Sequence, residues 1–254
     1  MRDEADIIIT NPPFSLFREF ISWIMEAGKQ FLIIGNMNAI TYKEVFPLLR
    51  DNKVWLGNNY RINGGAMFFE LPESIANLDQ VREIKTDANG NKTYITRVQG
   101  VRWFTNIDHG HRHLPLPLMT TEDNLMYSKH KEIKGKASYD RYDNYDAIEV
   151  PYVDAIPSDY PGMMGVPVSF LDKYCPEQFE IIGYEKSYHL QTKTYPTQIQ
   201  VDKNGKKSNV SKLNDGVAIQ SEEPLLTETY YIVDGKNYVQ RFKRIFIQKK
   251  GTAE

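Results

Sequence analysis

The sequence of 254 residues, 41% hydrophobic and 25% charged, is long enough to bury the core of one large domain or of two modest ones. Its net charge of −2 is not typical of a nucleic-acid binder, and its one cysteine, Cys175, excludes an internal disulfide and cannot by itself supply a thiolate metal site. No apolar run approaches the roughly 20 residues that span a bilayer, and the opening residues lack a signal-peptide pattern, so we expect a cytoplasmic protein with no membrane partner.

The N-terminal region predicts a strand, a helix and a second strand. Residues 6–10 form a β-branched run that ends at two prolines, which cannot continue a hydrogen-bonded ladder. Ser15 can cap a helix that runs through Ala27 and stops at Gly28. Residues 31–35 form another apolar run, and we expect it to be a second buried strand.

A second helix is expected from about Thr41, where Pro47 would kink it or end it early. Both strands of this region are apolar without alternation, and helices separate them. This pattern predicts a parallel sheet that is covered on both faces.

From residue 54 onward the pattern changes to short β-type runs. We expect strands at 54–57, 66–71, 94–98, 101–105, 179–184, 198–201, 230–233 and 244–248. Turns are expected at Asn89-Gly90, Asn204-Gly205 and Asp234-Gly235. Residues 107–165 are rich in Tyr, Asp, His and Pro and too long for a simple connection, so we expect an irregular segment that is functional or disordered.

The tetrapeptide Asn11-Pro12-Pro13-Phe14 stands at the carboxyl end of the first predicted strand, the edge where open α/β sheets place their ligands. The amino nitrogen of adenine is a poor nucleophile because its lone pair is delocalised into the ring. Two acceptors aimed at its two hydrogens would direct that lone pair towards a methyl sulfonium. The Asn11 side-chain carbonyl and the Pro12 backbone carbonyl are suited to this role.

The neighbouring residues fit the same chemistry. Each proline fixes φ, and the Pro-Pro step holds Pro12 extended, which sets the direction of its carbonyl. Phe14 offers a flat face for a base taken out of a duplex, a contact worth roughly 1–3 kcal/mol. The alternative is a strand-ending loop in which two prolines occur without a catalytic role.

Five segments together resemble the EcoRI-type adenine-specific DNA methyltransferases. They are residues 6–20, 31–40, 101–106, 142–149 and 165–174. The resemblance implies site-specific methyl transfer from S-adenosylmethionine to adenine N6 in double-stranded DNA, in a bacterial or phage restriction-modification system. It also implies that Asn11, Pro12, Pro13 and Phe14 are the catalytic residues.

The chain departs from the family at the cofactor motif. Family members carry a glycine-rich strand motif upstream of the tetrapeptide, but only ten residues precede Asn11, and the run at 179–184 holds one glycine. We therefore assign no cofactor-binding residues and expect weak S-adenosylmethionine binding by this chain alone. We also expect the edge at Ile7 to Ile9 to need cover, from a missing N-terminal segment or from self-association.

Further candidates for substrate contact follow the predicted strands. Asn36 and Asn38 could line the pocket, or they could serve turn chemistry. Trp103 or Phe104 could stack on the flipped base, with core packing as the alternative.

Three histidines alternate within residues 109–113, but their spacing does not match zinc motifs, and we expect no metal site. Arg112 and its histidine neighbours could instead contact phosphate, or the loop could be plain surface. Two further segments are basic: Lys129, Lys131, Lys134 and Lys136, and Lys236, Arg241, Lys243, Arg244, Lys249 and Lys250. Of these we expect Lys243 and Arg244 to bind DNA phosphates, with a solvated surface as the alternative.

The fold expected is α/β. Residues 1–107 would form a partial Rossmann-like methyltransferase core that lacks the cofactor motif, and residues 108–254 a mixed, mostly β region that recognises the target DNA. Two alternatives stay open: a non-catalytic DNA-binding module or remnant, and a methyltransferase that acts on RNA or on protein amides.

Overall fold

The structure, a computed structural model, describes residues 2–57, 67–76, 78–98, 100–222, 228–241 and 243–251. The chain forms two compact units. The first holds residues 1–113 together with Leu171–Lys173, and the second holds Leu114–Phe170 and 174–254. No helix among the described residues is long and apolar enough to cross a membrane.

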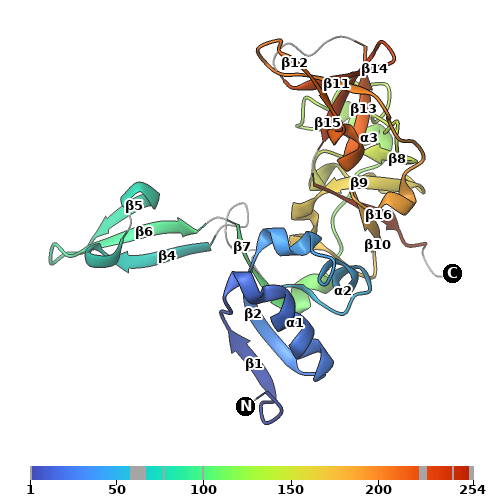
Figure 1. Cartoon of the computed structure of the whole chain (residues 1–254). Helices are drawn as coiled ribbons and strands as arrows, with labels where there is room; N and C mark the ends of the chain where they lie inside the picture. Colours follow the sequence, from blue (N-terminus) through green and yellow to red (C-terminus); the bar gives the residue numbers. More distant parts are fainter. Residues whose placement is uncertain are drawn as a thin grey trace. The chain divides into compact units, whose positions relative to one another are not determined.

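The first unit is built on a mixed four-stranded sheet (Figure 1). Its order is β1 (Ile7–Thr10), β2 (Gln30–Asn36), β7 (Val101–Thr105) and β3 (Trp55–Leu56). The predicted parallel pairing of β1 and β2 is confirmed, but β7 runs antiparallel to both β2 and β3. Strands β1, β2 and β3 therefore share one direction, and the expectation of a wholly parallel sheet is wrong at β7.

One helix covers one face of this sheet. A 3-10 turn, η1 (Phe14–Leu16), leads into α1 (Phe17–Glu26), whose buried stripe includes Phe17. The Phe17 ring packs on Phe104 of β7 with 5.1 Å between centroids, and a Cβ at Gly35 would overlap both rings. Gly28 ends the helix with a φ of +62°, as predicted. The predicted cap at Ser15 is wrong, because Leu16 occupies the cap position and no side chain caps it.

The other face of the sheet is less covered than expected. The register pairs Ile9 with Leu32, so Ile7 and Ile9 point away from the face that carries Phe31 and Ile33. Phe31 and Ile33 are fully buried, whereas Ile7 is 47% exposed and Ile9 68% exposed. Among the described residues, the prediction of cover on both faces therefore fails at β1.

The segment after β2 differs from its prediction. A 3-10 helix, η2 (Met37–Thr41), comes first, and the short helix α2 (Phe46–Arg50) begins only at Phe46. Pro47 lies in the first turn of α2, where its missing N–H costs no helical hydrogen bond. The proline thus starts this helix and does not break it.

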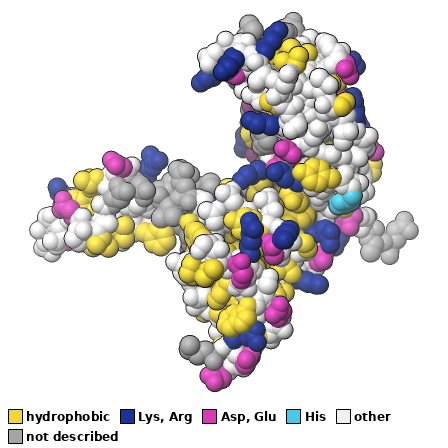
Figure 2. Space-filling view, in the orientation of Figure 1, with side chains coloured by type: hydrophobic (Ala, Val, Ile, Leu, Met, Phe, Trp, Pro, Cys, Tyr) yellow, Lys and Arg dark blue, Asp and Glu magenta, His cyan; other side chains and the backbone are white. Residues whose placement is uncertain are grey.

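A separate three-stranded antiparallel sheet lies between β3 and β7 in sequence. Its order is β4 (Met67–Pro72), β6 (Lys92–Val98) and β5 (Val81–Thr86), with η4 (Glu73–Ile75) and η5 (Leu78–Gln80) between β4 and β5. The predicted turn at Asn89-Gly90 is confirmed, with Gly90 at a φ of +84°. The sheet exposes Phe68, Phe69 and Ile84, and Figure 2 shows hydrophobic side chains on its surface among charged ones.

The second unit contains two mainly antiparallel sheets. One has the order β10-β16-β9-β8 and the other β12-β11-β14-β15-β13. The strands are β8 (Ala147–Glu149), β9 (Met163–Pro167), β10 (Phe179–Tyr184), β11 (Gln198–Val201), β12 (Lys207–Val210), β13 (Val217–Ser221), β14 (Tyr230–Val233), β15 (Lys236–Arg241) and β16 (Arg244–Lys249). All four strands predicted in this region are confirmed.

Residues 107–165 are more regular than predicted. They contain α3 (Thr121–Tyr127), whose N-cap Thr120 accepts a hydrogen bond from the Asp123 N–H, together with β8 and the start of β9. Short 3-10 helices also occur in the chain: η6 (Gly110–His113), η7 (Val153–Ala155), η8 (Val168–Lys173), η9 (Tyr188–Leu190) and η10 (Lys212–Asp215).

A buried ion pair joins two strands of the second unit. Arg244 of β16 donates to Glu149 of β8 at 2.5 Å from Nη2 and 3.0 Å from Nε, and their side chains are only 12% and 5% exposed. The Tyr142 hydroxyl also donates to the Glu149 carboxylate. Burial, with the Glu149 charge, raises the pKa of Tyr142 well above its usual value, so this hydroxyl stays protonated.

Removing one member of the buried pair is expected to destabilise the second unit strongly. Glu149→Ala would leave the Arg244 guanidinium buried without its carboxylate, which costs about 3–5 kcal/mol. Glu228→Ala is the control, because it breaks the exposed Glu228–Arg241 pair at 3.0 Å, a change worth about 1 kcal/mol or less. Equilibrium urea unfolding measures both, and similar losses from the two variants would contradict a special role for Glu149.

Candidate functional site

The ends of the parallel strands define the candidate site. Strand β1 ends at Thr10 and β2 at Asn36, and because the two run in the same direction both ends lie at one edge of the sheet. The same edge receives the start of β7, since the Met37 N–H donates to the Gly100 carbonyl at 2.6 Å. The tetrapeptide at 11–14 therefore follows the carboxyl end of an edge strand.

Within the tetrapeptide, two carbonyl groups are left available. Asn11 is exposed, and its amide forms no hydrogen bond with any residue that the structure describes. Pro13 has φ −55° and ψ 128°, and its carbonyl accepts the Leu16 N–H at 3.0 Å. Pro12 is buried, but among the described residues no backbone N–H donates to its carbonyl. The Asn11 amide and the Pro12 carbonyl are thus two acceptors of the motif that have no partner among the described residues.

Phe14 starts the 3-10 turn and keeps part of its ring in solvent. It is 39% exposed, and Leu16 two residues later is also exposed, whereas Phe17 is buried under the sheet. The turn therefore anchors one ring in the core and leaves the ring three residues after Asn11 partly exposed. An exposed aromatic ring in the same tetrapeptide as two unpaired acceptors is the residue set that a planar, hydrogen-bonding ligand requires.

The other asparagines at this edge serve the turn after β2. The Asn36 side chain accepts the Asn38 N–H at 2.8 Å and caps η2. The Asn38 carbonyl accepts the Thr41 hydroxyl at 3.0 Å. Asn36 thus fits the alternative of ordinary turn chemistry, while the exposed Asn38 side chain stays at the rim.

The aromatic pair on β7 divides between the two faces of the sheet. Phe104 is fully buried against Phe17 and has no ring surface to offer a ligand. Trp103, its neighbour, is half-buried. The core-packing alternative therefore describes Phe104, and of this pair only Trp103 keeps an accessible surface.

A second buried ion pair lies near this edge and has no local signal in the sequence. Arg102, which pairs with Gly35 across the strands, donates to Asp172 at 3.1 Å. Burial raises the pKa of Asp172 above its usual value, against the opposing effect of the Arg102 guanidinium. Each partner falls in one of the segments that carry the family resemblance, 101–106 and 165–174, and that coincidence is the only sequence clue.

The histidine-rich loop is held by its own contacts. The Arg112 guanidinium lies 3.6 Å from the centre of the Trp55 ring and pairs with Asp108, and it is buried. His109 contacts the Leu56 carbonyl at 3.1 Å, and His113 contacts Asp108 at 2.8 Å. Arg112 therefore serves packing, which argues against a phosphate contact there. No cluster of metal-binding side chains occurs among the described residues.

The two residues predicted to bind phosphate near the C-terminus, Lys243 and Arg244, differ in exposure. Arg244 is buried in its ion pair with Glu149, so its charge is not available to a DNA phosphate. Lys243 is exposed.

Cys175 is buried, and burial raises the pKa of its thiol, so it is not a reactive thiolate.

Comparisons with known proteins agree on one family. A family model described as "Adenine-specific methyltransferase EcoRI" matches residues 1–250. The Type II methyltransferase M.EcoRI of Escherichia coli is 44% identical over 183 residues, which cover 72% of this chain and 51% of that protein.

Two mycoplasma proteins give similar matches. The Type II methyltransferase M.MgeORF184P of Mycoplasma genitalium is 36% identical over 181 residues, covering 70% of this chain and 52% of that protein. The Type II methyltransferase M.MpnI of Mycoplasma pneumoniae is 35% identical over 181 residues, covering 70% and 51%. The chain thus spans about half the length of the curated relatives it matches. No solved structure matches it.

The free state of the Asn11 amide leads to a stability prediction. Asn11→Ala removes an exposed group with no partner among the described residues, so the free energy of unfolding should change by less than about 0.5 kcal/mol. Asn106→Ala is the contrasting variant, because the Asn106 side chain accepts the Phe31 N–H at 2.8 Å and donates to the Lys29 carbonyl at 2.9 Å. We expect it to cost about 1–3 kcal/mol in urea unfolding. A comparable loss in Asn11→Ala would mean that Asn11 has a structural role.

Proposed function

Because the chain belongs to the family of EcoRI adenine-specific methyltransferases, we propose that it takes part in methylating adenine N6 in double-stranded DNA, within a restriction-modification system of a bacterial or phage-infected cytoplasm. The observation that carries the proposal is the pair of unpaired acceptors, the Asn11 amide and the Pro12 carbonyl, at the carboxyl edge of the sheet. In this proposal residues 1–107 form the catalytic part and residues 108–254 recognise the target.

The four-stranded sheet is proposed to be part of a Rossmann-like methyltransferase core. Support comes from the parallel pairing of β1 and β2 and from the helix α1 that connects them. Doubly wound sheets that carry an antiparallel strand have it at an edge, whereas the reversed strand β7 lies between β2 and β3, so the proposal rests on the parallel part of the sheet. The exposed edge and face of β1, where Ile7 is 47% and Ile9 68% exposed, suit further strands and helices that would extend the sheet.

The chain's own residues account for the handling of the target base. The Asn11 side-chain carbonyl and the Pro12 carbonyl would accept the two hydrogens of the adenine amino group, which draws its lone pair out of conjugation with the ring. The exposed Phe14 ring would stack on the base after it leaves the duplex. S-adenosylmethionine, when bound, supplies an electrophilic methyl group on a sulfonium.

The fit to that donor is incomplete within this chain. Asn11 and Phe14 can border only the end of the donor that carries the methyl group. The sequence offers no glycine-rich turn for the adenosine and no acidic residue placed after such a turn for the ribose hydroxyls. We propose that a missing N-terminal segment, or self-association at the β1 edge, completes the donor site.

A non-catalytic DNA-binding module is the second candidate. In that candidate the tetrapeptide at 11–14 is present without a cofactor site to serve it. The two candidates differ in donor binding and in the effect of changing Asn11.

Donor binding is tested by calorimetric titration of S-adenosylmethionine. We expect little or no binding by the 254-residue chain, because most of the donor would lack partners. We expect micromolar binding by a version extended at its N-terminus with the corresponding segment of a relative. Micromolar binding by the unextended, monomeric chain would show that a donor site has been missed.

The catalytic role is tested in the form of the protein that methylates DNA. Asn11→Ala should lower the rate of methyl transfer by roughly 10²–10³-fold, because one preorganised acceptor is lost. DNA affinity should stay unchanged, since the amide does not contact phosphate. Asn11→Asp keeps acceptor oxygens and should retain more activity than Asn11→Ala. Turnover near that of the wild type in Asn11→Ala would rule out the mechanism.

A further inference from the structure

A lysine-rich segment of the second unit, residues 126–136, is held in a fixed shape. Ser128 and Ile133 are buried, and the Gly135 N–H donates back to the Leu125 carbonyl at 2.8 Å. His130 stacks on Tyr152 with 3.6 Å between ring centroids and 5° between planes. The side chains that project from this segment therefore start from an ordered backbone, which lowers the entropy lost when they bind a ligand.

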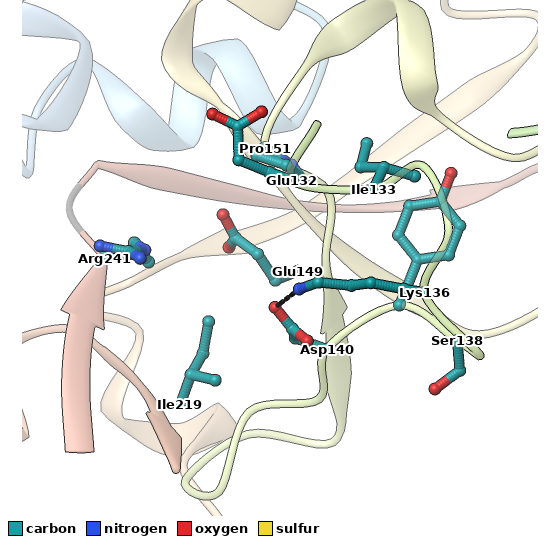
Figure 3. Close-up of a pocket in the computed structure, with 10 residues that line it drawn as sticks. Glu132, Ile133, Lys136, Ser138, Asp140, Glu149, Pro151, Ile219 and Arg241 are labelled. Carbon is teal, nitrogen blue, oxygen red and sulfur yellow. Dashed lines mark hydrogen bonds and ion pairs between the residues drawn. The ribbon is translucent and has the colours of Figure 1, made fainter. Parts of the chain in front are cut away.

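The four lysines of the segment fall into two pairs. Lys129 pairs with Asp154, and Lys136 with Asp140, each at 2.6 Å. Figure 3 shows Lys136 extended towards Asp140 at the wall of a cavity of about 190 Å³, so its charge is neutralised within the protein. Lys131 and Lys134 are exposed and form no ion pair or hydrogen bond through their side chains among the described residues. Of the four lysines, these two are thus the ones whose ammonium groups have no direct counter-ion contact among the described residues, and hydrogen bonds, with a smaller contribution from the Lys131 charge, lower the pKa of the neighbouring Glu132.

Lys134 also lies on the wall of an open groove of about 600 Å³, together with Leu125, Met126 and Lys136 and with the carboxylates Glu122 and Asp159. Tyr127, next to it in sequence, is 66% exposed, and its hydroxyl has no partner in the part of the chain that the structure describes. Lysine ammonium and tyrosine hydroxyl groups are among the donors that proteins use for DNA phosphates. Lys131, Lys134 and Tyr127 are exposed on one ordered segment, and their polar ends have no partner among the described residues. Such a set suits a phosphodiester backbone.

The other basic segment is less suited to that role. Arg244 is buried against Glu149, Arg241 pairs with Glu228 at 3.0 Å, and the Lys249 ammonium donates to the Ser158 carbonyl at 2.6 Å. These three cationic side chains of the C-terminal segment therefore have partners within the protein.

From these contacts we infer that Lys131 and Lys134 bind phosphates of the target duplex, with Tyr127 as a neutral donor beside them. The inference rests on the proposed function, because it names the surface on which the second unit holds its DNA. Each phosphate contact releases a counterion, so the contacts contribute to affinity through a dependence on salt.

The test is fluorescence anisotropy of the full chain with a labelled DNA duplex between 50 and 200 mM salt. Lys131→Ala with Lys134→Ala should flatten the log–log dependence of affinity on salt by about 1.8 units, since each contact contributes about 0.9. The ratio of wild-type to variant affinity should therefore fall about tenfold across that range.

Two double variants serve as controls for the loss of two positive charges. Lys129→Ala with Lys136→Ala removes the same formal charge from the same segment, but from lysines already paired with aspartates. Lys203→Ala with Lys206→Ala removes two lysines of the turn before β12. Both are expected to keep the wild-type slope within about half a unit.

The possible results distinguish a failure of the phosphate contacts from a failure of the proposed function. Flattening confined to Lys131→Ala with Lys134→Ala supports the inference. A wild-type chain that binds DNA while this variant keeps its slope, or equal flattening by either control, overturns the inference and leaves the proposed function standing. A wild-type chain that binds no duplex at 50 mM salt overturns both.

Discussion

Two consecutive prolines end β1, and the availability of the Asn11 amide depends on that end. Neither ring nitrogen can donate to β2, so the ladder stops where Thr10 pairs with Ile33, and the chain passes into the 3-10 turn at Phe14. Because Pro13 gives its carbonyl to Leu16, the turn is closed without using the Pro12 carbonyl or the Asn11 side chain. Backbone geometry, and not a network of side chains, leaves these groups free, so the motif needs little support from the rest of the chain.

Which lysines and arginines have a free charge depends on burial and pairing in the fold more than on how many of them stand together in the sequence. In the second unit Arg244 and Glu149 neutralise each other in the core, and the paired lysines Lys129 and Lys136 do so at the surface. A net charge of −2 therefore says little about partners. What matters for a polyanion is the small set of cations that the fold leaves without a counter-charge.

The sequence predicted the local parts of the fold well. The parallel pair β1 and β2, the glycine that ends α1 and the strand at 198–201 follow from short-range patterns, and the structure confirms them. Strand β8 was missed because three residues carry no readable period. The role of Arg102 was missed for another reason. Burial and pairing across 70 residues, as between Arg102 and Asp172, depend on tertiary contacts that a local pattern does not contain.

The link between Arg244 and Glu149 spans 95 residues of sequence, and it bears on how this unit can be exchanged among relatives. The same core holds Tyr142, Val217 and Phe246, so residues 142–246 are interdependent. A recombination point inside that stretch would place Glu149 from one parent against Arg244 and its neighbours from another parent. Points near residue 114, where the second unit begins, would move the stretch intact. Inheritance of this region as a block is thus the route by which it could be exchanged among relatives without loss of folding.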